Sequence, residues 1–267
     1  MADRRFPTLE VTVDAVGRRG TITLDRPERL NAMSPALLAD LVAAAEWFDS
    51  NTDATVVTVH GSGRSFCAGF DLQAFSDQRS AAEARATADL GRRMADAITG
   101  MRAVTIAAVH GHCVGGGLVL AASCDLRLAD TTARFSIPEV DLGIPLAWGG
   151  IPRLVRELGP ALTKELVLTC RPFGPDEALA ARFLNRVVPE GTVLHAADEL
   201  AASLADKSPF VLSITKRHIN AVTEEMGSTA TSFLDADVLG SAQRDPESRA
   251  AAARYLDRRA AGRRPAS

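Results

Sequence analysis

The stretch HGHCVGGGL, residues 110–118, decides our expectation of the fold, because it joins two segments of different character. Before it, residues 104–110 form a short apolar run rich in β-branched side chains, which predicts a buried strand. After it, residues 118–123 predict the start of a helix. Glycines let a ligand approach the backbone closely, and the first amides of a helix have no acceptor within that helix. The turn therefore suits a phosphate or a developing oxyanion.

A second turn of this kind, SFCAGFDL at residues 65–72, follows another β-branched run at residues 55–60. Taken alone, each turn is explained about equally well by tight packing of a helix against a strand. The turn at residues 110–118 lacks both the Gly-Lys-Ser/Thr ending of a Walker loop and the G-x-G-x-x-G fingerprint of dinucleotide sites. The chain has no G-x-S-x-G motif, so a serine hydrolase would lack its nucleophile.

The segment FSIPEVDLGIP, residues 135–145, places two acids, Glu139 and Asp141, in an otherwise apolar loop. Apolar surroundings raise the pKa of a carboxyl group, and a raised pKa suits a general acid and base. On this segment alone, a surface acid or a helix-cap partner is the better explanation. His110 and His112 lie close together, but no third residue completes a metal-binding spacing.

Strands and helices alternate through the first two thirds of the chain. We expect a hairpin of residues 9–16 and 21–24, a helix with Ser34 as its N-cap, a helix over residues 80–100 and a strand over residues 125–129. From residue 150 to about residue 259 the pattern is mostly helical, with a short strand near residues 185–188. This order predicts an α/β core followed by a helical C-terminal part.

The composition is typical of a water-soluble globular protein, with 46% hydrophobic and 24% charged residues among 267. A formal net charge of −3 argues against nucleic acid as a partner. The four cysteines form no C-x-x-C pair, so we expect reduced thiols. The N-terminus lacks the apolar run of a signal peptide, and no apolar stretch reaches the roughly 18 residues of a membrane span. We therefore expect a cytoplasmic protein without membrane insertion.

Six segments follow one another along the chain: DRPERLNA (25–32), FCAGFDL (66–72), VGGGL (114–118), CDLR (124–127), FSIPEVDLGI (135–144) and GGIPRL (149–154). Each is weak alone, but together and in this order they closely resemble the crotonase family, the enoyl-CoA hydratase/isomerase superfamily. The resemblance runs from about residue 21 to about residue 188. It implies a spiral of repeated β-β-α units over residues 1–200. It also implies a helical region over residues 201–267 that builds homotrimers, often paired into hexamers.

The same resemblance implies an acyl-CoA substrate, with coenzyme A as part of that substrate and no separate cofactor or metal. The family's oxyanion-hole donors correspond to the backbone amides of Phe70 and Gly116, and its catalytic acid corresponds to Glu139. Two such donors stabilise the enolate of a thioester, and each is typically worth about 3 kcal/mol of barrier. The substrate-binding positions implied by the resemblance are Arg29, Leu30, Ala32, Ala68, Asp71, Leu72 and Gly115.

Three basic residues, Lys216, Arg258 and Arg259, are candidates for the 3′-phosphate of coenzyme A, from the same or a neighbouring subunit. A solvated basic face explains these residues at least as well. Trp148 could shape the acyl pocket, although an ordinary core tryptophan is the better explanation. Asp141 could assist catalysis in a specialised branch of the family, although a structural role is the better explanation.

Val119 separates the chain from the hydratases of the family, which carry a second glutamate at the matching position. Those enzymes hold and polarise a water between two carboxylates, whereas a single Glu139 can still move a proton between two carbons. We therefore expect enoyl-CoA double-bond isomerisation. Ala147 likewise stands where dienoyl-CoA isomerases and 4-chlorobenzoyl-CoA dehalogenases carry an aspartate. The main alternative is hydration of 2-enoyl-CoA in fatty-acid degradation. Two less favoured alternatives are acyl-CoA hydrolysis and a non-catalytic CoA-binding scaffold.

Overall fold

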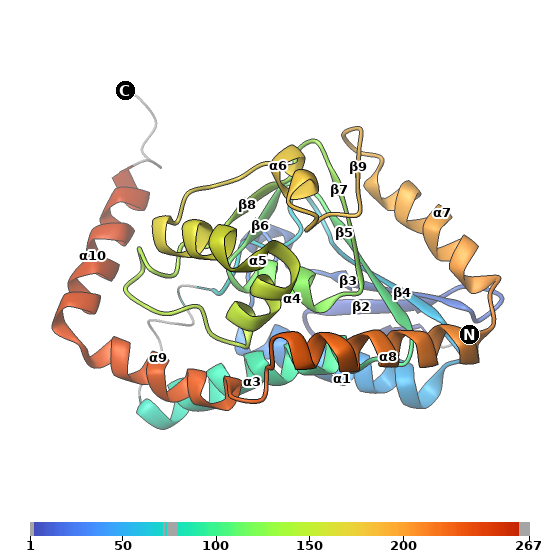
Figure 1. The fold of residues 1–267 in the computed structure, drawn as a ribbon, viewed down its shortest axis with the longest axis horizontal. Helices are drawn as coiled ribbons and strands as arrows, with labels where there is room; N and C mark the ends of the chain where they lie inside the picture. The colour runs from blue at the N-terminus through green and yellow to red at the C-terminus, as the bar shows by residue number, and fades with distance from the viewer. Residues whose placement is uncertain (1–2, 72, 74–79, 262–267) are drawn as a thin grey trace.

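A computed structural model describes residues 3–71, 73 and 80–261 of the chain. Within those residues, the centre is a seven-stranded sheet in the order β1-β2-β3-β4-β5-β7-β9 (Figure 1). The pairs β1–β2 and β2–β3 are antiparallel, and each later pair is parallel. The strands are β1 (Arg4–Arg5), β2 (Leu9–Val13), β3 (Arg19–Leu24), β4 (Val56–Gly61), β5 (Val104–Val109), β7 (Leu126–Asp130) and β9 (Arg186–Val188).

The parallel part of the sheet is covered on both faces, so its strands read as continuous apolar runs. All six residues of β5 are buried. On one face, Val57 and Ala107 enter an apolar cluster with residues of the helices α1 (Pro35–Asn51) and α3 (Ala81–Gly100). On the other face, Ile106 packs in a smaller cluster with α7 (Val193–Ala205).

The short strands β6 (His112–Val114) and β8 (Arg134–Ser136) form a separate parallel pair. The sequence analysis took residues 111–117 as a turn alone and missed both strands. Three residues are too few to show a periodicity, and their pairing joins segments that lie far apart in the chain. This small sheet carries the glycine turn in front of α4 (Gly116–Ser123) and leads directly into the loop that contains Glu139.

Most of the remaining helices of the described residues lie in the C-terminal part, which the sequence predicted as mostly helical without giving the bounds of single helices. The remaining helices are η1 (Pro27–Arg29), α5 (Gly150–Thr169), α6 (Pro175–Ala180), α8 (Pro209–Met226), η2 (Ser232–Leu234), α9 (Asp235–Arg244) and α10 (Pro246–Ala261). The predicted N-cap at Ser34 is confirmed, because its hydroxyl oxygen accepts a hydrogen bond from the Leu37 amide at 3.2 Å. The mixed α/β architecture with a helical C-terminal part is confirmed.

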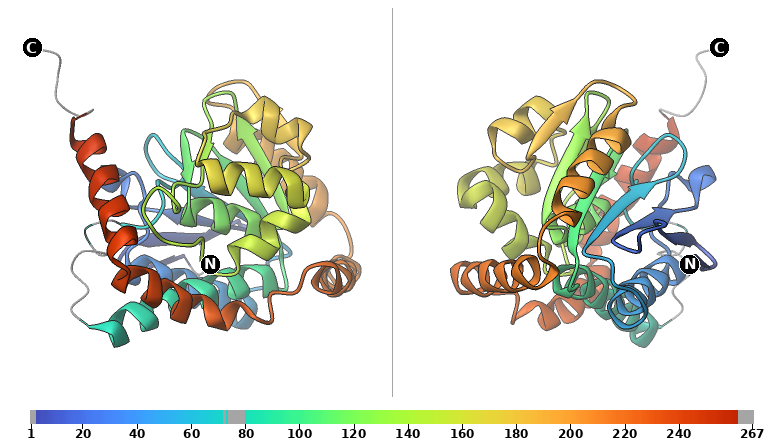
Figure 2. Two further views of the ribbon diagram at one scale, coloured as in Figure 1. Left: turned by 60° about the vertical axis from the view of Figure 1, so that its left-hand side comes forward. Right: turned by 90° about the vertical axis from the view of Figure 1, so that its right-hand side faces the viewer.

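The C-terminal helices turn back over the core after α7. Figure 1 shows α8 running along the side of the molecule occupied by α1 and α3, and α10 rising at the edge beyond α9. Figure 2 shows the same arrangement from two further directions, and α9 packs directly against α3. The domain boundary expected after residue 200 falls within α7 and stays a prediction. Among the described residues, no helix is both long and apolar enough to cross a membrane.

Candidate active site

The two glycine-rich turns identified in the sequence lie against each other. The Cys67 amide donates a hydrogen bond to the His112 carbonyl at 2.9 Å, and the Val114 amide donates to the Cys67 carbonyl at 3.0 Å. A Cβ added at Gly117 would lie only 2.6 Å from that same Cys67 oxygen. The contact therefore requires glycine, and it joins the two turns into one backbone surface.

The amides of Phe70 and Gly116 are both positioned by backbone geometry. The Met33 amide donates to the Gly69 carbonyl at 2.8 Å, and the Asp71 amide donates to the Met33 carbonyl at 2.9 Å. Because these bonds flank Phe70 on one side of the chain, its own N–H points to the other side. Gly116 is the first residue of α4, where an amide has no acceptor within the helix. Both residues line the same pocket.

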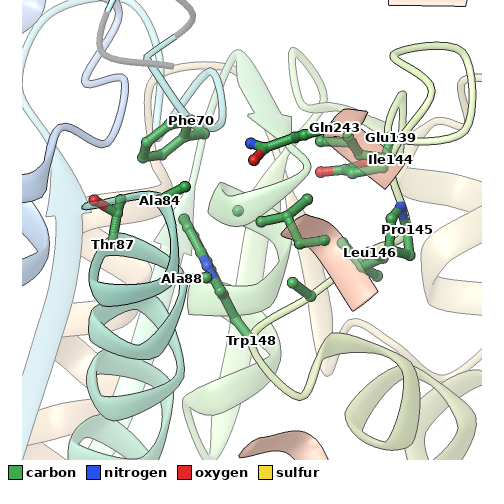
Figure 3. Close-up of a pocket in the computed structure, with 13 residues that line it drawn as sticks. Phe70, Ala84, Thr87, Ala88, Glu139, Ile144, Pro145, Leu146, Trp148 and Gln243 are labelled. Atoms are coloured by element: carbon green, nitrogen blue, oxygen red, sulfur yellow. The ribbon is translucent and has the colours of Figure 1, made fainter. Parts of the chain in front are cut away.

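Glu139 lies in the loop after β8, and its side chain reaches this pocket (Figure 3). Although the residue as a whole keeps some exposed surface, its Oε2 atom is buried and has no hydrogen-bond partner among the described residues. Burial raises the pKa of this carboxyl group from its ordinary value to about 7, partly offset by a hydrogen bond to the backbone. A carboxyl group with this pKa can both take up and return a proton near neutral pH.

Gly115 makes room for the carboxyl group. Its φ of +49° lies in the left-handed region, and its amide donates to the Ser136 carbonyl at 2.9 Å. A Cβ added there would lie 2.3 Å from Oε1 of Glu139. The glycine turn thus serves two purposes, because it presents the Gly116 amide and leaves the space that the Glu139 carboxyl group occupies.

Trp148 forms one wall of the pocket, which we call the Trp148 pocket (Figure 3). Its ring packs edge-on against Phe70 with centroids 5.9 Å apart. A Cβ at Gly116 would lie 2.4 Å from the indole ring, and one at Gly91 would lie 2.1 Å from it. Trp148 is thus buried like the core residue that we expected, and it also lines a pocket, as the alternative explanation required.

The chemistry of the Trp148 pocket is set by few polar side chains. Glu139 is the only ionisable residue among the described residues that line it, and Thr87 and Gln243 are the other polar ones. The sequence analysis missed both, because nothing in their local sequence marks α3 or α9 as part of a site. The rest of the lining is apolar or glycine: Phe70, Ala84, Ala88, Gly116, Ile144, Pro145, Leu146, Ala147, Trp148 and Leu239.

Residues 19–262 match the family model described as enoyl-CoA hydratase/isomerase. The chain belongs to this family. The expected crotonase membership is thus confirmed, and the protein is an enzyme of the enoyl-CoA hydratase/isomerase class.

Three of its relatives show how far the similarity extends. The chain is 32% identical over 211 residues to the short-chain-enoyl-CoA hydratase of Clostridium acetobutylicum, covering 79% of this chain and 80% of that protein. It is 36% identical over 199 residues to the mevalonyl-coenzyme A hydratase sidH of Aspergillus fumigatus, covering 73% and 72%. A solved structure described as subunit I of an enoyl-CoA hydratase from Geobacillus kaustophilus superimposes with a TM-score of 0.76 at 33% identity, covering 82% and 83%.

Other predicted positions lie around a second pocket that Glu139 also lines, which we call the Tyr255 pocket. Its described lining includes Ala68, Gly115 and Tyr255, a residue of α10 that the sequence analysis did not consider. Phe70 and Glu139 line this pocket as well as the Trp148 pocket. This enoyl-CoA hydratase/isomerase family member therefore brings its acid, one proposed oxyanion donor and two predicted substrate positions to one place.

The segment 25–32 supports the site through both its backbone and its side chains. The Ala68 amide donates to the Leu30 carbonyl at 3.0 Å, and a guanidinium N–H of Arg26 donates to the Ala32 carbonyl. Arg26 also forms an ion pair with Asp71 at 3.1 Å. The buried Asn31 donates to two carbonyls of the loop after β4, at 2.9 and 2.8 Å. The sequence analysis quoted Arg26 and Asn31 within its motif but assigned them no part in holding the site.

Four described positions among those predicted line neither pocket: Arg29, Leu30, Ala32 and Asp71. The exposed Arg29 donates to Gln73 at 3.1 Å. Leu72 lies outside the described residues.

Lys216 is not available to bind a phosphate, so both explanations given for it from sequence were wrong. Its ammonium group is buried, lies 2.7 Å from Asp125 and donates to the Ala103 carbonyl at 2.8 Å. Arg258 is exposed and faces Asp141 across 3.9 Å, and the side chain of Arg259 lies outside the described residues. Within the described residues, no group of three or more His, Cys, Asp and Glu side chains is arranged to bind a metal.

Proposed function

We propose that the protein hydrates the double bond of a 2-enoyl-CoA thioester. The observation that carries the proposal is the single pocket in which the partly shielded Glu139 carboxyl group meets Phe70 and Gly116. The names of the relatives, among them a short-chain-enoyl-CoA hydratase and a crotonyl-CoA hydratase, support hydration more than the isomerisation that we expected from sequence.

In the proposed reaction, the amides of Phe70 and Gly116 donate to the thioester oxygen as negative charge develops on it. Glu139 carries the proton, since its pKa of about 7 leaves both forms populated near neutral pH. Ala68 and Gly115 would lie along the arm of coenzyme A, because both line the Tyr255 pocket beside the same carboxyl group. Arg29, Leu30, Ala32, Asp71 and Leu72 stay predicted substrate-binding positions.

Isomerisation of a 3-enoyl-CoA is a second candidate, because Val119 offers no second carboxylate. Val119 is buried, and its Cγ2 atom would lie 2.9 Å from a Cβ added at Gly150. It is not among the described residues that line either pocket. A lone Glu139 suffices for isomerisation, which takes a proton from one carbon and returns it to another.

Three assays with purified protein separate these functions. Hydration consumes the conjugated absorbance of crotonyl-CoA, isomerisation of a 3-enoyl-CoA creates it, and hydrolysis releases a free thiol. We expect hydration by the wild type and a loss of about 100-fold or more in kcat for Glu139→Gln. The matched control is Asp141→Asn, which changes an exposed acid of the same loop and should retain activity within about threefold.

Hydration of crotonyl-CoA at nearly wild-type rate by Glu139→Gln would contradict the assignment of the proton carrier. Tight acyl-CoA binding without turnover of any thioester would instead identify a scaffold.

We also propose that the protein assembles into trimers or hexamers. The helices α8, η2 and α9 expose large apolar side chains that a monomer would leave in water. They are Phe210, Val211, Ile214, Ile219, Val222, Met226, Phe233, Leu234 and Val238.

A further inference from the structure

Gln243 is a polar side chain in a mostly apolar pocket, and the chemistry described so far gives it no role. It lies on α9, and Figure 3 shows its amide end projecting into the Trp148 pocket between the Phe70 and Glu139 side chains. The residue is half-buried. Among the described residues, none forms a hydrogen bond with its side chain, although an amide has two donors and an acceptor to satisfy.

The side chains around Gln243 offer its amide few hydrogen-bonding groups. Its neighbours in the lining include Ile144, Leu146 and Leu239, which offer no hydrogen-bonding side chain. Because the half-buried amide has no hydrogen-bond partner in the described part of the chain, its donors and its acceptor are free to bind a partner that arrives with the substrate. A carboxamide also stays uncharged at every physiological pH, so it can hold an oxygen atom but cannot act as a base.

The fold fixes the helix that carries this amide. Asp235, at the start of α9, accepts a hydrogen bond from the Gly149 amide at 2.8 Å. Gly149 follows Trp148 directly in the chain. On the same helix, Asp237 forms an ion pair with Arg85 of α3. Both contacts tie α9 to two segments that line the Trp148 pocket, α3 and the segment around Trp148, so Gln243 has a defined place relative to Glu139.

We infer that the Gln243 amide holds the oxygen atom that joins C3 of the acyl group during hydration. This inference rests on the proposed function, and it supplies the contact with water that Val119 cannot make. Other enzymes of the family use a second glutamate for that contact, whereas here a neutral amide from a C-terminal helix would take its place.

The step balances with Glu139 as the only proton carrier. The Glu139 carboxylate takes one proton from water as the water oxygen bonds to C3 of the enoyl thioester. The π electrons of C2=C3 form the enolate, whose charge rests on the thioester oxygen beside the amides of Phe70 and Gly116. Glu139 then returns the proton to C2. The Oε1 atom of Gln243 accepts the second O–H of the water, which remains in the product as the 3-hydroxyl group.

The test compares two reactions of one site. Hydration of crotonyl-CoA needs the water to be held, whereas exchange of the C2 protons of butanoyl-CoA with deuterium oxide needs only Glu139 and the enolate. We expect Gln243→Met to lower kcat for hydration by about 10- to 100-fold and to leave the exchange rate within about threefold. Gln243→Leu should show the same split. The matched control is Arg244→Leu, which changes the next, exposed residue of α9 and should alter neither rate.

Three outcomes would overturn the inference. Hydration by Gln243→Met within twofold of wild type would show that the amide does not hold the water. An equal loss of hydration and exchange would show that the residue only supports the pocket. A wild type that exchanges C2 protons but does not hydrate would refute the proposed function itself, and that result is visible before any variant is made.

Discussion

Glu139 combines a shielded carboxyl group with a position beside two backbone turns. The sequence predicts a raised pKa from its apolar neighbours, and the structure agrees, because burial raises the pKa to about 7. A buried acid destabilises the folded protein when it is ionised. The residue that we propose for catalysis is therefore also one that weakens the fold.

This cost predicts a dependence of stability on pH. The ordinary carboxyl pKa of 4.5 applies to the unfolded chain, and the folded chain has a pKa of about 7. Between these values only the folded state keeps the proton, so stability falls as pH rises through this window and stays lower above it. Glu139→Gln removes the penalty. Its gain in unfolding free energy over the wild type should be larger at pH 8 than at pH 5.5, by about 2 kcal/mol.

Urea denaturation of both proteins at the two pH values measures this difference. Asp141→Asn is the control. Its effect on the unfolding free energy should differ by less than about 0.5 kcal/mol between the two pH values, because the residue is exposed. An effect of Glu139→Gln that is the same at both pH values would show that the folded protein does not hold this proton.

At the scale of elements, the site depends on two glycine-rich turns that follow strands and contact each other. The turn before α4 and the turn after β4 meet through hydrogen bonds between Cys67, His112 and Val114. Sequence patterns predicted each turn as a strand end followed by glycine. Their contact could not be predicted from local patterns, because it depends on the order of strands in the sheet. The short pair β6–β8 was missed for the same reason.

Two glycine substitutions should have different effects, one in the turn before α4 and one at the end of α3. Gly115→Ala should lower kcat by about 100-fold or more, because the new methyl group would displace the Glu139 carboxyl group. It should also cost about 1 to 3 kcal/mol, since φ at this position is positive. Gly100→Ala is the matched control, because a Cβ there meets nothing within 4 Å.

Steady-state hydration rates and melting temperatures of the two variants check this prediction. The Gly100→Ala protein should keep wild-type kcat and melt at the wild-type temperature or above it. A Gly115→Ala protein with wild-type activity would mean that Glu139 does not need the space beside the turn.

At the scale of the whole molecule, the C-terminal helices contribute in two ways. Their inner side brings Gln243 and Tyr255 to the two pockets around Glu139. Their outer side exposes apolar residues such as Phe210 and Met226, which are 75% and 72% accessible. An exposed surface of this kind suits association between copies of the chain.

Light scattering coupled to size-exclusion chromatography tests this association. We expect the mass of a trimer or hexamer for the wild type and a shift toward monomer for Val222→Arg, because a charge on an apolar interface is costly. Leu168→Arg changes an exposed apolar residue of α5 and serves as the control that should keep the wild-type mass. A monomeric wild type would contradict the proposed assembly.

The sequence by itself determined the features that depend on neighbours along the chain. These include the strand and helix alternation, the cap at Ser34, the glycine turns and the apolar loop around Glu139. Only the tertiary structure decided which distant side chains share a pocket. It brought Trp148 and Gln243 to Glu139, and it buried Lys216 against Asp125. The reason is physical: backbone preference and periodicity act over a few residues, whereas burial and contact follow from how whole elements pack.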